Sequence, residues 1–195
     1  MSAGLPRLLK EIRACRICEA HLEPRPVIHA SARAKICILA QAPGIRVHET
    51  GISFNDPSGD RLREWMGIGR EVFYDGDLVA IIGMGFCFPG YNAAGGDLPP
   101  RKECAEAWQD KLFAVLPPFE LTLLVGSYAI DWHLKGHKKS SVAETVKAWR
   151  NYAPRILPLP HPSWRNNAWL KKNPWFQAEL LPYLRRAVKR ALKPA

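Results

Sequence analysis

Short apolar runs alternate with amphipathic segments along the chain, and each run has the length of a buried strand. The runs are KICILA (35–40), LVAIIG (78–83), FELTLLVG (119–126) and RILPL (155–159). Strands buried on both faces of a parallel sheet read as continuous apolar runs of this kind. The pattern therefore predicts four strands.

The segments between these runs have the mixed composition of surface helices. Helices are predicted at 5–15, from Ser58 to 68, at 103–116, 127–134 and 142–152, and from Trp175 to the C-terminus. Because strands and helices alternate, we expect an α/β protein with three layers, α/β/α, around a central, mostly parallel four-stranded sheet. A single domain is expected over residues 1–195. Ligands bind at the carboxyl ends of the strands in such sheets, so the loops that follow the strands should share one crevice.

The composition changes this picture only through its charge. The 195 residues are 47% hydrophobic and 24% charged, which is ordinary for a globular protein. The net charge of +10 and the pI near 9.6 favour a polyanionic partner, nucleic acid before an acidic membrane surface. A merely basic soluble enzyme is the alternative.

The chain shows no apolar segment that would direct it to a membrane. The first twenty residues lack the apolar core of a signal peptide, and the most apolar stretch, 78–90, is too short to span a bilayer. We therefore expect a cytoplasmic protein without membrane contact, in which structural disulfides are rare.

Four cysteines form two pairs that suit a metal site. Cys15 and Cys18 make a C-x-x-C pair, Cys87 lies in the long loop after the second strand, and Cys104 lies at the start of the next helix. Four thiolates can hold zinc or an iron–sulfur cluster. The wide spacing of the second pair weakens a zinc ribbon without excluding it, and four unrelated buried thiols are the remaining alternative.

The fourth predicted strand leads into an unusual histidine. In RILPLPHPSWRNN (155–167), His161 stands between Pro160 and Pro162. Each proline fixes its own φ and restricts the residue before it, so this stretch is stiff and extended. A histidine held in that way is a candidate functional residue.

Several segments together resemble one family. AQAPG (40–44) follows the first strand, GISFNDPSGDRLREWMGI (51–68) contains a phenylalanine before a turn and a helix, and HPSWRN (161–166) follows the last strand. In these features the chain resembles the uracil-DNA glycosylase superfamily, specifically its iron–sulfur branches, the fourth and fifth families. That resemblance implies a structural [4Fe-4S] cluster, and the positions that match its ligands are Cys15, Cys18, Cys87 and Cys104.

The resemblance also implies roles in cutting the bond between a base and its sugar. His161 would donate a hydrogen bond to uracil O2, over which Gln41 and Ala42 would place backbone N–H groups. Asp56 would act on the water and the sugar cation, and Phe54 would stack on the flipped base.

The role of Asp56 has alternatives in the sequence itself. An aspartate near a helix start commonly caps the helix. His48 and Glu49 are the other candidates for handling the water.

One position departs from the family pattern. Where the superfamily usually has an asparagine that reads the uracil edge, this chain has Gly83. Backbone groups from Gly83 and Met84 onward, or a folded-back Asn92, would then have to read the base. Hypoxanthine or another damaged base is therefore an alternative substrate.

Residues after His161 are candidates for contact with DNA. Trp164 stands where the family has the wedge that fills the gap left by the flipped base. Arg165 and Lys171 are suited to phosphate contacts, and Ser163 completes the motif. The expected partner is single- or double-stranded DNA that contains uracil, bound by a monomer.

The sequence thus predicts a monofunctional uracil-DNA glycosylase that leaves an abasic site in base excision repair. Ala42 and Gly83 motivate a second hypothesis, a catalytically inactive iron–sulfur protein that binds nucleic acid on a glycosylase-like scaffold. A zinc-stabilised basic enzyme of another kind is the third.

Overall fold

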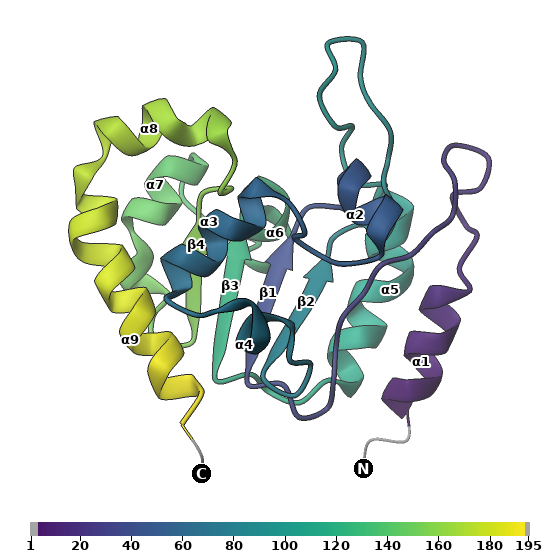
Figure 1. The fold of residues 1–195 in the computed structure, drawn as a ribbon, viewed down its shortest axis with the longest axis horizontal. Coiled ribbons are helices and arrows are strands. Elements are labelled where there is room, and N and C mark those ends of the chain that lie inside the picture. Colours follow the sequence, from purple (N-terminus) through teal and green to yellow (C-terminus); the bar gives the residue numbers. More distant parts are fainter. Residues whose placement is uncertain (1–3, 194–195) are drawn as a thin grey trace.

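A parallel sheet forms the centre of the molecule in the computed structural model, which describes residues 4–193 (Figure 1). The strand order is β2-β1-β3-β4, and all neighbouring strands are parallel. The strands are β1 (Ile36–Ala40), β2 (Val79–Gly83), β3 (Leu121–Val125) and β4 (Ile156–Leu159). Each lies inside its predicted run, so the four-stranded sheet is confirmed.

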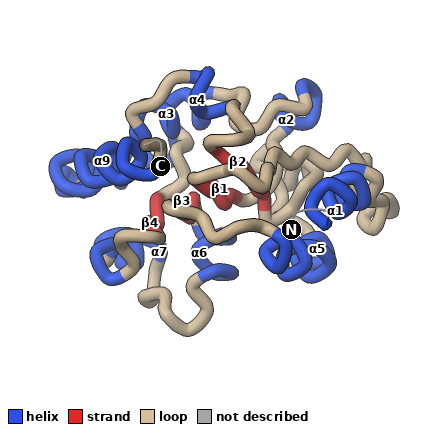
Figure 2. The backbone as a smooth tube through the Cα atoms, turned by 90° about the horizontal axis from the view of Figure 1, so that it is seen from below, coloured by secondary structure: helices blue, strands red, loops and turns tan. Residues whose placement is uncertain are grey.

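Helices cover both faces of the sheet (Figure 2). On one face lie α3 (Pro57–Met66), α4 (Arg70–Tyr74) and α9 (Leu181–Ala191). On the other lie α5 (Lys102–Val115), α6 (Ser127–His133) and α7 (Val142–Lys147), with α1 (Gly4–Arg13) packed beside α5. The predicted three-layer α/β/α architecture is confirmed.

The remaining helical segments are short. They are α2 (Ile45–Thr50), α8 (Asn167–Lys172), 3-10 turns at Trp149–Asn151 and Trp164–Asn166, and a π-helical segment at Phe176–Leu180 that runs into α9. The sequence reading did not predict α2 or α4, because five or six residues contain too little of a helical period to stand out. None of the helices within residues 4–193 is long and apolar enough to cross a bilayer.

The start of α3 differs from the prediction. Ser58 does not begin the helix; Asp56 is its N-cap and accepts a 2.8 Å hydrogen bond from the Gly59 N–H. Pro57 takes the first helical position, where its missing N–H costs nothing. The helix therefore begins at Pro57, one residue before Ser58, because the Asp-Pro pair is the stronger start signal.

The strand order brings distant loops together. The chain moves from β1 to β2 on one side and then returns to β3 and β4 on the other, so β1 lies at the switch point of the sheet. The loops after β1, β2 and β4 consequently meet at the carboxyl edge. The loop from 84 to 101 is the longest of these, and its middle forms a hairpin that projects above the sheet (Figure 1).

Candidate active site

A cavity of about 450 Å³ lies where those loops meet. Its walls come from the loop after β1, the start of α3, the end of β2, the hairpin and the loop after β4. Most of the predicted site residues line it: Gln41, Ala42, Phe54, Asp56, Gly83, His161, Ser163, Trp164 and Arg165. Its size is that of a small-molecule site.

His161 is held rigidly at one wall. Asn166 donates its side-chain amide to the His161 carbonyl at 2.6 Å, and Arg61 donates to the Ser163 carbonyl at 3.0 Å. Burial lowers the pKa of His161, the Asp56 charge opposes this shift, and Arg165 adds to it. The imidazole is therefore neutral near pH 7 and able to donate one N–H while it accepts at its other nitrogen.

Asp56 reaches the cavity from the start of α3. Its Oδ1 is engaged as the helix cap, so the carboxylate is fixed in position. Asp56 thus caps α3 and also lines the cavity, so the two roles weighed for it from the sequence do not exclude each other. Asp56 and His161 line the same cavity from different loops, and the negative charge of Asp56 raises the pKa of His161 against the larger effect of burial.

Phe54 has an unusual backbone at the cavity. Its φ of 54° makes it the sole non-glycine residue with positive φ within the described part of the chain. The Phe54 carbonyl accepts the Tyr74 hydroxyl at 3.1 Å, and it approaches Gly59 so closely that a Cβ there would lie 1.8 Å from the oxygen. A bulky residue in this region is strained and persists where surrounding contacts enforce it.

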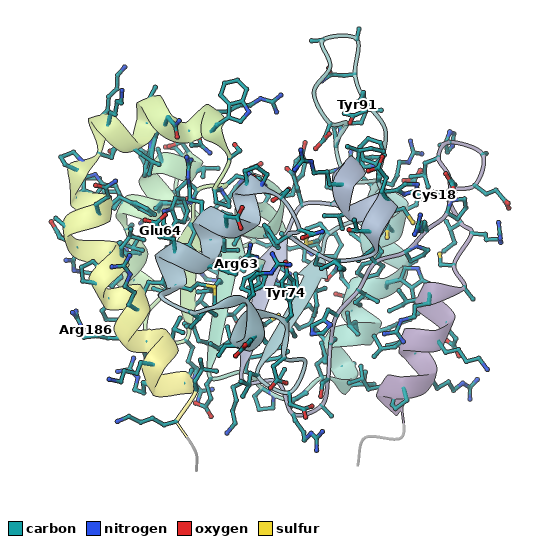
Figure 3. All side chains as sticks on the ribbon, viewed as in Figure 1. Cys18, Arg63, Glu64, Tyr74, Tyr91 and Arg186 are labelled. Atoms are coloured by element: carbon teal, nitrogen blue, oxygen red, sulfur yellow. The ribbon has the colours of Figure 1, made fainter. Side chains whose placement is uncertain are left out.

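Buried Arg63 supplies much of that enforcement, and the sequence reading missed it. Its guanidinium donates to Tyr74 Oη at 3.1 Å and to the Phe54 carbonyl at 3.4 Å, and it pairs with Asp60 at 2.5 Å. Arg63 and Tyr74 lie against each other between α3 and α4 (Figure 3). An arginine inside an otherwise apolar helix face was the available signal for this cluster.

The end of β2 has no room for a side chain. A Cβ at Gly83 would stand 2.3 Å from the Gly85 carbonyl oxygen, and the Gly83 carbonyl accepts the amide of buried Gln109 at 2.7 Å. Met84 is buried and does not line the cavity, and its N–H donates to the Ala40 carbonyl at 2.8 Å. The structure therefore does not bring Met84 into the site.

The loop after β4 exposes its aromatic residue. The Trp164 side chain is 72% exposed, beside Arg165, whose guanidinium carbon lies 5.6 Å from the Trp164 ring centre. Lys171 lies on α8, exposed and outside the cavity lining. Trp164 and Arg165 thus form an aromatic and basic edge of the cavity.

His48 and Glu49, the alternative water-handling residues, do not line the cavity. His48 is buried in α2 with Nε2 3.3 Å from a carboxylate oxygen of Glu23. Glu49 accepts Arg25 at its backbone carbonyl. Asp97, which the sequence reading did not single out, does line the cavity. It comes from the hairpin, whose fold a sequence pattern does not show.

A second, small cavity is lined by all four paired cysteines, Cys15, Cys18, Cys87 and Cys104. Two N–H groups donate to the sulfur atoms: Trp108 Nε1 to Cys15 at 3.3 Å and the Phe86 amide to Cys104 at 3.4 Å. Burial raises the pKa of the Cys87 thiol to about 11 and that of Cys104 to about 12. Any metal bound here must therefore displace thiol protons.

The four thiols do not meet at one point. Within residues 4–193 no group of three His, Cys, Asp or Glu side chains is close enough to hold a single metal ion. A zinc ion needs its sulfur ligands about 2.3 Å from one centre. All four thiols nevertheless line the same small cavity.

A comparison with protein-family models identifies the family to which this fold belongs. Residues 28–185 match the model described as the uracil DNA glycosylase superfamily. The matched segment contains β1 to β4 and every site residue named above except the N-terminal cysteine pair.

Proposed function

The chain belongs to the uracil DNA glycosylase superfamily, and from this premise we propose that it removes uracil from DNA by hydrolysis and leaves an abasic site. Superfamily membership indicates glycosylase activity on DNA bases; uracil as the base and the residue roles are our proposal. The observation that supports it most is that His161, Asp56 and Phe54 converge on one cavity.

The reaction sets three demands on the site. The target base must leave the duplex stack and enter a pocket. Breaking the N-glycosidic bond then develops negative charge on the base and positive charge on the sugar, so the site needs a donor for the first and a carboxylate for the second. The cavity offers a histidine donor, His161, and a carboxylate, Asp56, from different loops, and Phe54 lines it as well.

His161 meets the first demand. As a neutral imidazole it donates an N–H to the base oxygen without bringing a charge that would have to be buried before the reaction. Backbone N–H groups of Gln41 and Ala42, at the end of β1, add donors on the same side. Such donors act because they are already oriented when the charge develops.

Asp56 meets the second demand. The cap hydrogen bond from Gly59 holds its carboxylate at the cavity wall, where its charge stabilises the sugar cation. Phe54 provides a flat surface for the base, and the positive φ enforced by its neighbours directs its side chain. Because Gly83 carries no side chain, the base edge must be read by backbone groups and by other cavity walls, and hypoxanthine is the alternative substrate.

Trp164, Arg165, Ser163 and Lys171 form the proposed DNA contact. The exposed Trp164 ring is placed to fill the gap that the flipped base leaves, and the two cations suit phosphates. Trp164→Ala should weaken base release from duplex DNA more than from single strands, because a single strand has no stack to refill.

A [4Fe-4S] cluster is our proposal for the cysteine cavity. The four thiols line one cavity, and two of them, Cys15 and Cys104, accept N–H···S hydrogen bonds; both features suit thiolate ligands of a cluster. When bound, such a group would cross-link the N-terminal segment, the loop after β2 and α5. Iron and sulfide analysis of anaerobically purified protein tests this; zinc with no iron would overturn it.

The catalytic proposal is tested with single-turnover base release from oligonucleotides that carry uracil or hypoxanthine. We expect His161→Ala and Asp56→Asn each to lower uracil release by about 100- to 1000-fold, with Lys193→Ala as a remote control. Unchanged rates in both variants would remove the mechanism. Tight DNA binding without any base release would favour the inactive binding protein instead.

A further inference from the structure

The hairpin in the loop after β2 delivers a carboxylate to the active-site cavity. Tyr91 and Asp97 pair across the hairpin, and the amides of Asn92 and Leu98 close the ladder on either side at 2.8 Å each. The Asn92 side chain accepts the N–H groups of Ala94 and Gly96 and so shapes the tip. Residues paired in this way project from the same face of the hairpin.

Aromatic packing sets which way that face points. The Tyr91 ring packs edge-on against Phe88 at 5.0 Å between ring centres, and Phe88 lies 6.0 Å from the buried His48 ring of α2. Figure 3 shows Tyr91 within the hairpin, next to α2. Asp97, the bridge partner of Tyr91, lines the cavity, where its Oδ2 lies 3.6 Å from the position of a Cβ on Gly44.

The Asp97 carboxylate has no partner in residues 4–193: no donor hydrogen-bonds to it and no cation pairs with it. Three charged or titratable groups from other elements share its cavity: Asp56 before α3, and His161 and Arg165 after β4. Partial burial raises the pKa of Asp97, the Arg165 charge lowers it, and Asp56 raises it, with a net increase.

The two carboxylates of the cavity therefore differ in a useful way. Asp56 is fixed by its cap hydrogen bond, which suits electrostatic stabilisation of the sugar. Asp97 is unpartnered and on a loop, which suits a group that must accept a proton. A general base works best when its pKa approaches the working pH. Where their surroundings give two carboxylates different pKa values, the two groups can take different roles in one reaction.

We propose that Asp97 is a further catalytic residue, the general base that takes a proton from the attacking water. This inference rests on the proposed glycosylase function. The water oxygen bonds to the sugar C1′ as the C1′–N bond breaks, and the bonding pair leaves on the base, which His161 stabilises. One water proton passes to Asp97 and is later returned to the base anion, so water and nucleoside yield the abasic sugar and the free base.

The test is base release by Asp97→Asn, which keeps the size of the side chain and removes its basicity. Single-turnover release of uracil is measured from pH 4 to 9. In wild type the rate should rise with pH as Asp97 ionises and then level off. In Asp97→Asn the rate should fall by roughly 100-fold or more and lose this rise. Asp56→Asn should be slower at every pH and keep the rise, moved to lower pH because the Asp56 charge raises the pKa of Asp97.

Matched controls separate chemistry from folding and binding. Asp110→Asn removes an exposed carboxylate on α5 and should match wild type. Affinity of Asp97→Asn for uracil-containing DNA and its thermal unfolding should stay at wild-type values, because Asp97 makes no hydrogen bond in the fold. An Asp97→Asn protein with wild-type rates and the same pH profile would overturn the inference and leave the glycosylase function standing. A wild-type protein that releases no base would overturn both.

Arg165 gives an independent readout. Its cation lowers the Asp97 pKa, so Arg165→Gln should move the rise in rate to higher pH, in addition to any loss of DNA affinity. Tyr91→Ala should slow base release although Asp97 itself is unchanged. The substitution removes the packing of Tyr91 on Phe88, so the face of the hairpin that carries Asp97 is held less firmly. No movement of the pH profile in Arg165→Gln would contradict the assignment of the profile to Asp97.

Discussion

The two cavities of this molecule lie on either side of one loop and are built in opposite ways. The active-site cavity is about 450 Å³, opens to solvent and is lined by polar groups from several loops. The cysteine cavity is small, and apolar residues and prolines surround its thiols. The first is suited to a substrate that enters and leaves, and the second to a group that stays.

The loop from 84 to 101 joins the two. Its start, Gly85 to Cys87, and its end at Arg101 line the cysteine cavity, whereas Gly95 and Asp97 in its middle line the active site. A loop this long without regular structure needs ties at both ends to present its middle accurately. The comparison therefore indicates that the buried cavity positions the open one.

Cys87→Ser should have the largest effect, because it would remove a ligand of the proposed cluster in the shared loop. We expect loss of iron, a free energy of unfolding lower by roughly 3 kcal/mol or more, and loss of base release. Iron content, denaturant unfolding and single-turnover kinetics measure the three. Cys37→Ala, in the buried strand β1, is the control and should keep its iron. A full iron content in Cys87→Ser would show that Cys87 does not link the cysteine cavity to the active-site cavity.

Gly83→Ala should damage both cavities by a different route. Its Cβ would stand 2.3 Å from the Gly85 carbonyl oxygen and push the start of the shared loop aside. Overpacking of this kind costs about 1–3 kcal/mol, and we expect both slower base release and poorer iron retention. Gly69→Ala is the matched control, since nothing lies within 4 Å of the added methyl. A wild-type result for Gly83→Ala would show that the loop adjusts freely.

Phe54→Gly should affect the open cavity alone. It removes the stacking surface, worth about 1–3 kcal/mol per base, so base release should fall by roughly 10- to 100-fold. Glycine adopts a φ of 54° without strain, which offsets part of the lost packing, and stability should change little. Phe54→Tyr keeps the ring and should retain most activity. An equal loss in both variants would argue against stacking.

The smallest effect is expected at His133, remote from both cavities. Burial lowers the pKa of His133 to about 4, and its Nε2 has no hydrogen-bond partner among the described residues. The unfolded chain binds this proton below about pH 6.5 and the folded chain does not, so stability is lost as the pH falls. His133→Leu should recover about 2 kcal/mol of unfolding free energy at pH 5 relative to pH 7.5. Parallel pH curves for both proteins would refute this.

The sequence by itself determined the sheet, and the family resemblance marked most of the candidate residues that line the cavity. Continuous apolar runs located the four strands because their burial on both faces leaves no place for polar residues. Stiff or glycine-bearing loops after those strands marked His161 and the segment from Gln41 to Gly44, because α/β sheets gather such loops at one edge. The helix cap at Asp56 was also readable, since Asp and Pro have strong positional preferences.

Only the tertiary structure decided which groups meet. Asp97 lines the cavity from a hairpin in which Tyr91 packs on Phe88, and Arg63 of α3 and Tyr74 of α4 both donate to the Phe54 carbonyl; no spacing in the sequence encodes these contacts. The same holds for Met84, which sequence position suggested for the site and which the core buries. Side-chain direction in a loop depends on long-range packing and not on local propensity. The hydrophobic pattern could therefore predict at which edge of the sheet the site lies, but not the full set of groups that face the cavity.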